Sequence, residues 1–284
     1  IIKRKIAMLK KRFLAVAAIG TFALPGMAFA EEAAAPSPIT GNFTLATDYI
    51  FRGVSQTMGN PAVQGGFDYA HSSGLYVGTW ASNVSGTQYT NANMEWDFYG
   101  GYAGKINDDF SYNVGAIYVF YPDGVTAAAP AQNKKWNTAE MYGGVTWKWI
   151  NVKASYSLTN WYGIGKDGGF IPTEIDTGAS SADNAANPDD SKGSLYLEAN
   201  ITYELPAKFM LLGHIGHQTI ENYGALDYTD WKLGVSKDFS GFNVALAYTD
   251  TNANKYNLYY VTDATGEQKK LSEGAVTLSV TKTF

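Results

Sequence analysis

The sequence predicts an all-β fold: a transmembrane up-and-down antiparallel β-barrel of about 12 strands, following a cleaved signal peptide. Three observations predict it. Apolar and polar residues alternate with a period of two in twelve separate segments, and that period is typical of strands with two different faces. The connections between the segments are alternately short and long. The chain is also 14% aromatic, has 30 glycines and lacks cysteine, a composition typical of membrane barrels.

Residues 1–30 have the three-part layout of a secretory signal peptide. KRKIAMLKKR has six cationic residues and no acid, FLAVAAIGTFAL is apolar, and AFA precedes Glu31 as a small-residue cleavage site. A membrane anchor helix is the alternative, but a span needs about 20 apolar residues, and this run is shorter and ends at Pro25. We therefore expect a short periplasmic segment at 31–38 and an outer-membrane barrel at 39–284.

The charge balance excludes some partners. The whole chain has 21 Lys and Arg against 26 Asp and Glu, and removal of the six leader cations leaves 15 against 26, a net charge of −11. Binding of nucleic acid needs basic stripes, so we expect no nucleic-acid partner. Without cysteine there is neither a disulfide framework nor a site for lipoprotein attachment.

The first six strands each show the alternation. Phe43 and Leu45 alternate with Thr44, and in the fourth strand Trp96 and Phe98 are opposite in parity to acidic neighbours. Since successive side chains on a strand point to opposite faces, the apolar set is expected to meet lipid and the polar set to face the lumen. The predicted ranges are 43–51, 63–69, 75–82, 94–102, 110–120 and 137–149.

The last six strands repeat the pattern. Leu195, Leu197 and Ala199 are opposite in parity to Tyr196 and Glu198, for example. The predicted ranges are 152–158, 195–203, 208–217, 228–238, 242–249 and 275–284. The total of twelve is even, as expected for a barrel with both termini on the periplasmic side.

The connections separate a membrane barrel from a soluble sandwich. The short ones are 71–74, 105–109, the turn around 150–151, 205–208 and 238–241, and the long ones are 52–62, 83–93, 121–136, 161–193, 218–227 and 250–274. Short and long alternate throughout. An up-and-down barrel produces this order because its turns are tight at one end and free at the other, whereas Greek-key crossovers disturb it.

The chain stops within a strand, AVTLSVTKTF. An uncovered terminal strand invites aggregation, so this strand is expected to pair with the first one and close the barrel. A terminal aromatic residue, here Phe284, also resembles the signal that outer-membrane barrels present to the barrel assembly machinery.

Inward parity selects a set of lumen and selectivity candidates. Seven carboxylates and four cations share it, which predicts a wet, net acidic interior. Mutual pairing that closes the lumen is the alternative. The carboxylates are Asp48, Asp68, Glu95, Asp97, Glu140, Glu198 and Asp230, the cations are Arg52, Lys148, Lys153 and Lys232, and His214 joins them as a hydrogen-bonded lumen residue.

Arg52 lies at the outer end of the first strand and has two interpretations. It either pairs with a wall carboxylate and holds the root of the loop, which we favour because an unpaired charge beside a low-dielectric wall is costly, or it stands at the mouth as a selectivity charge. Gly53 then allows the chain to turn.

Enzymatic and metal sites are not expected, and no cofactor is implied. The chain has three histidines; His71 lies in a turn, and His214 and His217 are an odd number of residues apart, so on a strand they face opposite sides. The long loop 163–194 is expected to be functional or mobile at its tip, because structureless loops beyond ~15 residues are one or the other.

Four stretches resemble one family. ITGNFTLATDYIFRGVSQTMGNPAVQGGFDYAHSSGLYVGTWASNV at 39–84, GHIGHQ at 213–218, DYTDWKLGVSKDF at 227–239 and AYTDTN at 247–252 are similar to the TorF family of bacterial porin-like barrels. The resemblance spans the mature chain. It implies a pore, and implies no particular substrate or site residue.

These observations predict a porin-like channel of the cell outer membrane for passive diffusion of small hydrophilic solutes, mildly cation-preferring. The main alternative is a non-conducting structural or adhesive barrel whose charge network closes the lumen, and a barrel enzyme is a third class. Expected partners are outer-membrane lipid and lipopolysaccharide, the barrel assembly machinery and the solutes.

Overall fold

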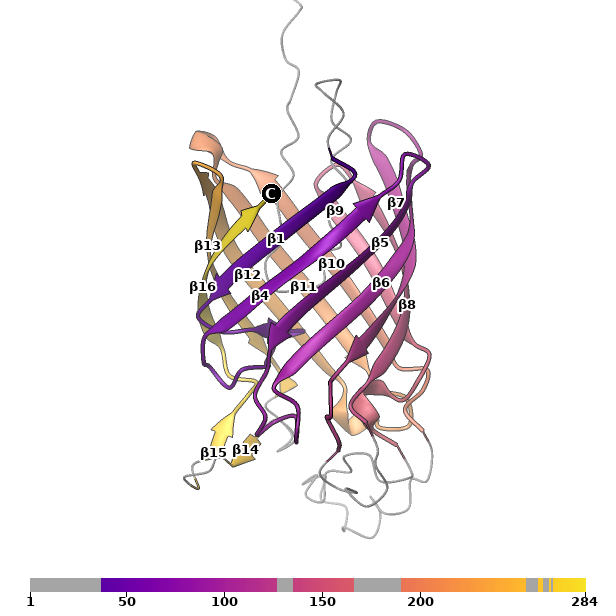
Figure 1. The fold of residues 1–284 in the computed structure, drawn as a ribbon, viewed down its shortest axis with the longest axis vertical. Coiled ribbons are helices and arrows are strands. Elements are labelled where there is room, and N and C mark those ends of the chain that lie inside the picture. Colours follow the sequence, from indigo (N-terminus) through magenta and orange to yellow (C-terminus); the bar gives the residue numbers. More distant parts are fainter. Residues whose placement is uncertain (1–36, 127–134, 166–189, 254–259, 263–265, 267) are drawn as a thin grey trace, which may run out of the picture.

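The computed structural model describes residues 37–126, 135–165, 190–253, 260–262, 266 and 268–284. The expected signal peptide, most of segment 31–38 and the centre of loop 163–194 lie outside the described residues. Twelve antiparallel strands form a closed barrel in which each strand pairs with its neighbour in the chain (Figure 1). The predicted antiparallel barrel of twelve strands is therefore confirmed, and the signal peptide stays a prediction.

The barrel strands alternate in direction around the wall. Their bounds are β1 Ile39–Ala46, β4 Ala62–Ala70, β5 Leu75–Asn83, β6 Met94–Lys105, β7 Phe110–Phe120, β8 Thr138–Trp147, β9 Ile150–Ser157, β10 Leu195–Glu204, β11 Met210–Thr219, β12 Tyr228–Phe239, β13 Phe242–Thr251 and β16 Ala275–Thr283. Two small hairpins accompany them, β2 Ile50–Phe51 with β3 Val54–Ser55, and β14 Tyr260–Thr262 with β15 Gln268–Lys270.

The closing pair is β1 with β16. Asn42 lies opposite Thr283 and Ala46 opposite Ser279. Gly41 and Phe284 exchange two backbone hydrogen bonds of 2.8 and 2.9 Å, so the last strand is paired and the barrel has no open edge. The ring of Phe284 packs edge-on against Phe67, with centroids 6.3 Å apart.

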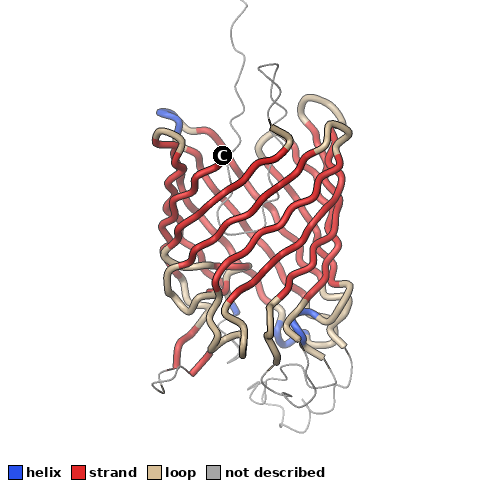
Figure 2. Tube along the Cα trace, viewed as in Figure 1, coloured by secondary structure: helices blue, strands red, loops and turns tan. Residues whose placement is uncertain are grey.

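Short turns gather at one end of the barrel and long connections at the other (Figure 1, Figure 2). The tightest turns have two residues, as in Ser240-Gly241, where both φ angles are positive; this is the primed turn that matches strand twist. The short 3-10 helix η3 (Pro206–Lys208) lies at the turn end, and η2 (Trp161–Gly163) and η4 (Gly224–Leu226) lie at the loop end.

The outside of the barrel is apolar. On β7, Phe110 near the turn end, Val114 in the middle and Tyr118 near the loop end all have exposed side chains, and β12 repeats this order with Phe239 and Trp231 at its two ends. Aromatic residues at both borders of an aliphatic band are typical of barrels in a bilayer. Among the described residues there is no helix of the length and apolarity that crossing a bilayer requires.

Candidate functional site: the lumenal hairpin and its charge network

The first long connection folds into the barrel. Tyr49 and Phe51 share the parity of Phe43 and Leu45, so the predicted first strand, 43–51, places them on its lipid face. That prediction is wrong, because β1 ends at Ala46 and the side chains of Tyr49 and Phe51 are only 3% and 9% exposed. We call residues 47–61 the lumenal hairpin; its centre is the β2–β3 pair.

The turn of the lumenal hairpin is Arg52-Gly53. Both φ angles are positive, 44° and 80°, which identifies a two-residue primed turn. A Cβ at Gly53 would lie 2.6 Å from Cβ of Asp230 and 2.9 Å from Cβ of Thr251. Only glycine therefore lets the turn approach the wall of β12 and β13 this closely.

Arg52 reaches from the hairpin to the opposite wall. Its Nη1 and Nη2 donate to the two carboxylate oxygens of Glu140 at 2.9 and 2.7 Å, and Nη1 also donates to Oε1 of Gln218 at 3.0 Å. The guanidinium lies 4.2 Å from the ring centroid of Tyr196. Since both charged side chains are 6% exposed, the pair is a buried, bidentate ion pair. Of the two interpretations of Arg52, the structure contains the wall-paired one.

Hydroxyl groups hold the base of the hairpin. Asp48 lies beyond the end of β1, and its Oδ1 accepts hydrogen bonds of 2.7 Å from both Ser55 and Thr57. Burial raises the pKa of the Asp48 carboxyl, and the hydrogen bonds from Thr57 and Ser55 lower it. The amide of Ser55 donates to the carbonyl of Leu271 at 2.8 Å, which ties the hairpin to the last long connection.

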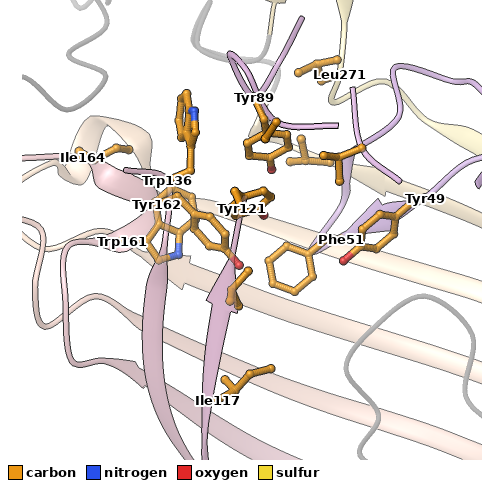
Figure 3. Packing of buried hydrophobic residues seen from close by; sticks show 14 of the residues in the cluster. Tyr49, Phe51, Tyr89, Ile117, Tyr121, Trp136, Trp161, Tyr162, Ile164 and Leu271 are labelled. Atoms are coloured by element: carbon orange, nitrogen blue, oxygen red, sulfur yellow. The ribbon is translucent and has the colours of Figure 1, made fainter. Parts of the chain in front are cut away.

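An aromatic cluster packs over the hairpin at the loop end (Figure 3). Tyr89 and Tyr121 stack with centroids 4.5 Å apart, and Phe51 meets Tyr162 edge-on at 6.0 Å. The hydroxyl groups of Tyr49 and Tyr121 both donate to Glu95. These buried rings lie inside the barrel at its loop end, above the hairpin.

Asp97 differs from its neighbour Glu95. Its side chain is fully buried, and neither carboxylate oxygen has a hydrogen-bond partner among the described residues. Glu95 and Glu140 are the carboxylates whose charges act on it. This side of the lumen therefore has three buried carboxyl groups, and Arg52 forms an ion pair with one of them, Glu140.

A second network lies on the opposite side, between β9 and β12. Lys153 forms an ion pair of 2.5 Å with Glu198. His214 Nε2 lies 2.9 Å from the hydroxyl of Tyr196 and 2.9 Å from Asp230, and its Nδ1 lies 2.7 Å from Oδ1 of Asn200. All ring atoms of His214 that can form hydrogen bonds are thus engaged.

The lumen and selectivity candidates fall into three groups according to the exposure of their side chains. Buried ones are Arg52, Asp68, Glu95, Asp97, Glu140, Glu198, His214 and Asp230, and half-buried ones are Asp48, Lys153 and Lys232. Asp68 accepts a 2.6 Å hydrogen bond from Tyr99. Lys148 is the exception: it lies in the exposed turn between β8 and β9 and is 3.5 Å from Asp109. Its expected place in the lumen is wrong because the strand ends at Trp147.

A small cavity lies between the lumenal hairpin and the wall. It is lined on the hairpin side by Asp48, Ile50 and Gly53, and on the wall by residues of β1, β4, β11, β12, β13 and β16, among them His214, Asp230 and Lys232. Within the part of the chain that the structure describes, no group of three or more His, Cys, Asp and Glu residues is arranged to hold a metal ion.

Sequence reasoning missed the inward fold of the hairpin and the aromatic cluster. One signal could have found the hairpin. Ile50-Phe51 and Val54-Ser55 flank a two-residue Arg52-Gly53 pair, and two short runs around a two-residue glycine-containing turn indicate a hairpin. Gln218, the second partner of Arg52, has no sequence signal of its own.

The geometry defines a class of protein, a closed twelve-stranded antiparallel barrel with an apolar exterior, a charged interior and a hairpin inside its lumen. The chain belongs to a bacterial family of unknown function, Gcw_chp, whose family model matches residues 30–284. The resemblance to the TorF family stays a prediction. No curated protein matches the chain.

Several solved structures are similar to it. The KdgM porin has 8% identity and a TM-score of 0.48, with 86% of this chain and 99% of that chain covered. The NanC porin has 9% identity and a TM-score of 0.45, with 86% and 97% covered. OprD from Pseudomonas aeruginosa has 13% identity and a TM-score of 0.36, with 87% and 66% covered. At these values the similarity carries no argument about function.

Proposed function

We propose that the protein is an outer-membrane channel for small hydrophilic solutes, and that the lumenal hairpin closes the channel in the conformation described above. The observation that carries the proposal is the pairing of a closed, apolar-faced barrel with a charged interior. Only a closed barrel satisfies every strand hydrogen bond in lipid, and a polar interior is typical of barrels that hold a water-filled channel.

The rival is a structural or adhesive barrel that never conducts. The bidentate pair of Arg52 with Glu140 and the buried aromatic cluster favour it. We prefer the channel because the closing element is a small hairpin whose β-strands have two residues each. Such a hairpin has little stability of its own and can leave the lumen while the barrel wall stays intact.

The proposed channel is mildly cation-preferring. Apart from the misplaced Lys148, three of the inward side chains considered are cationic and seven are carboxylates. Four of the carboxylates form no ion pair with a described residue: Asp48, Asp68, Glu95 and Asp97. A surplus of negative charge between low-dielectric walls enriches cations.

Single-channel recording in planar bilayers tests both points. We expect brief openings whose reversal potential in a potassium chloride gradient indicates cation preference. The double variant Glu95→Gln, Asp97→Asn should weaken that preference, and the preference of the wild type should shrink at high salt, because the Debye length is ~3 Å at 1 M. A wild-type channel that prefers anions would refute the charge argument.

The proposal also implies partners. The apolar band lies in outer-membrane lipid, with lipopolysaccharide around the loop end, and the barrel assembly machinery inserts the chain, with Phe284 as its recognition signal. No step requires a cofactor, and we propose no enzymatic activity.

A further inference from the structure

We propose that the pocket occupied by the Arg52 guanidinium is a receptor site for small solutes that carry a guanidinium group, and that such a solute opens the channel by displacing Arg52. The opening of the channel rests on the proposed function. The binding of a guanidinium solute rests on the geometry of the pocket alone.

The pocket has the features of a guanidinium site. Glu140 presents both oxygens to two N–H groups at 2.9 and 2.7 Å, Oε1 of Gln218 accepts a third hydrogen bond, and the ring of Tyr196 lies under the cation. This combination of a carboxylate fork, an amide oxygen and an aromatic face suits a planar guanidinium. An ammonium group, as a point charge, cannot use the fork.

The acceptors and the cation belong to different structural units. Glu140, Tyr196 and Gln218 lie on barrel strands β8, β10 and β11, whereas Arg52 lies at the tip of the lumenal hairpin. Arg52 therefore occupies the pocket as a tethered ligand. A free guanidinium solute makes the same hydrogen bonds, so the exchange of one for the other changes few contacts.

Concentration then decides the competition. A short tether gives an effective concentration in the millimolar range, so a solute must reach about that concentration to compete with Arg52. The rest of the hairpin opposes release through the hydrogen bonds of Asp48 and the backbone bond to Leu271. We therefore expect the channel to respond only to guanidinium solutes that reach at least millimolar concentration.

Asp97 provides a second observation. Its carboxylate is fully buried and has no hydrogen-bond partner among the described residues, and Glu95 and Glu140 act on it as further negative charges. An ionised carboxylate buried without a partner is unfavourable, so burial favours the protonated form of such a group. A cationic solute that enters beside Asp97 supplies the missing partner and favours the ionised form, whereas a neutral or anionic solute does not.

The test uses full-length protein and methylguanidinium as the probe. In wild-type channels, about 10 mM methylguanidinium should raise the open probability several-fold, since that concentration exceeds the effective concentration of the tether, and the same concentration of methylammonium should not. Calorimetry should detect binding of methylguanidinium to Arg52→Ala at least tenfold tighter than to wild type. Adding Glu140→Gln to that variant should reduce the binding at least tenfold. Lys148→Ala, a turn variant, serves as the charge-matched control and should behave as wild type.

The outcomes separate the two proposals. If Arg52→Ala conducts but binds no methylguanidinium, the receptor site is refuted and the channel stands. If Arg52→Ala binds methylguanidinium through Glu140 but no variant conducts, the site stands and the channel is refuted. Heat-modifiable migration on gels verifies folding, and Arg52→Lys, which keeps the charge but loses the fork, provides a second variant that should open more often than wild type.

Discussion

Replacement of Gly53 by alanine should unseat the lumenal hairpin. The new Cβ would lie 2.6 Å from Cβ of Asp230 and 2.9 Å from Cβ of Thr251, whereas carbon atoms pack at ~3.5–4.0 Å. The wall must therefore yield by about 1 Å, and overpacking of this kind typically costs ~1–3 kcal/mol. Gly59→Ala is the matched control, because Gly59 also has a positive φ, 73°, but no atom lies within 4 Å of its ideal Cβ.

Thiol labelling measures the release of the hairpin. The chain has no cysteine, so Val54→Cys, at a side chain that is 6% exposed, gives a single buried thiol. Labelling by a water-soluble maleimide follows the population in which the hairpin is out of the lumen. At ~1.4 kcal/mol per factor of ten, Gly53→Ala should label about 5- to 150-fold faster than Gly59→Ala. Equal rates in the two variants would refute the close approach of the turn to β12 and β13.

Two further predictions concern the free energy of unfolding, measured in urea on the refolded barrel. Gly216→Ala places a Cβ 1.9 Å from the hydroxyl of Tyr196, whereas the new Cβ of Gly213→Ala on the same strand meets its nearest atom at 3.5 Å. Gly216→Ala should therefore lower the free energy of unfolding by ~2–3 kcal/mol through lost hydrogen bonds and crowding, and Gly213→Ala should lower it by less than ~0.5 kcal/mol. An unchanged stability of Gly216→Ala would contradict the packing of the His214 network. Lys153→Ala should lower the free energy of unfolding by about 3 kcal/mol, because it leaves the buried carboxylate of Glu198 without its ion-pair partner. Lys148→Ala, which removes an exposed ion pair, should change it by at most ~1 kcal/mol. Equal effects of the two variants would refute the different placement of the two lysines.

The sequence was sufficient for the barrel wall because period-two alternation reports which face a strand residue takes. Trp96 and Glu95, for example, differ in parity and the structure places them on opposite faces. The same rule failed at Tyr49 and Phe51, where the alternation continues past the end of β1 into the hairpin. Parity describes a strand but does not tell where that strand leaves the wall.

The partners of Arg52 could not be predicted for a different reason. A fork-shaped cation near a wall requires some carboxylate, but seven inward carboxylates were available. Which one is reached depends on the tilt of the strands and on how far the hairpin extends across the lumen. The alternation of residues in one strand indicates neither the strand tilt nor the reach of the hairpin.

The closing pair of strands has a consequence for the order of folding. Thr44 and Thr281, which share a 2.8 Å hydrogen bond across the β1–β16 pair, are 237 residues apart in the chain. Contacts of such large sequence separation form late and slowly. The lumenal hairpin follows β1 directly in the chain, so it is synthesised early. The barrel wall around it is closed only when β16 pairs with β1. Until then the sheet has two unpaired edges, and such edges are able to pair with other chains.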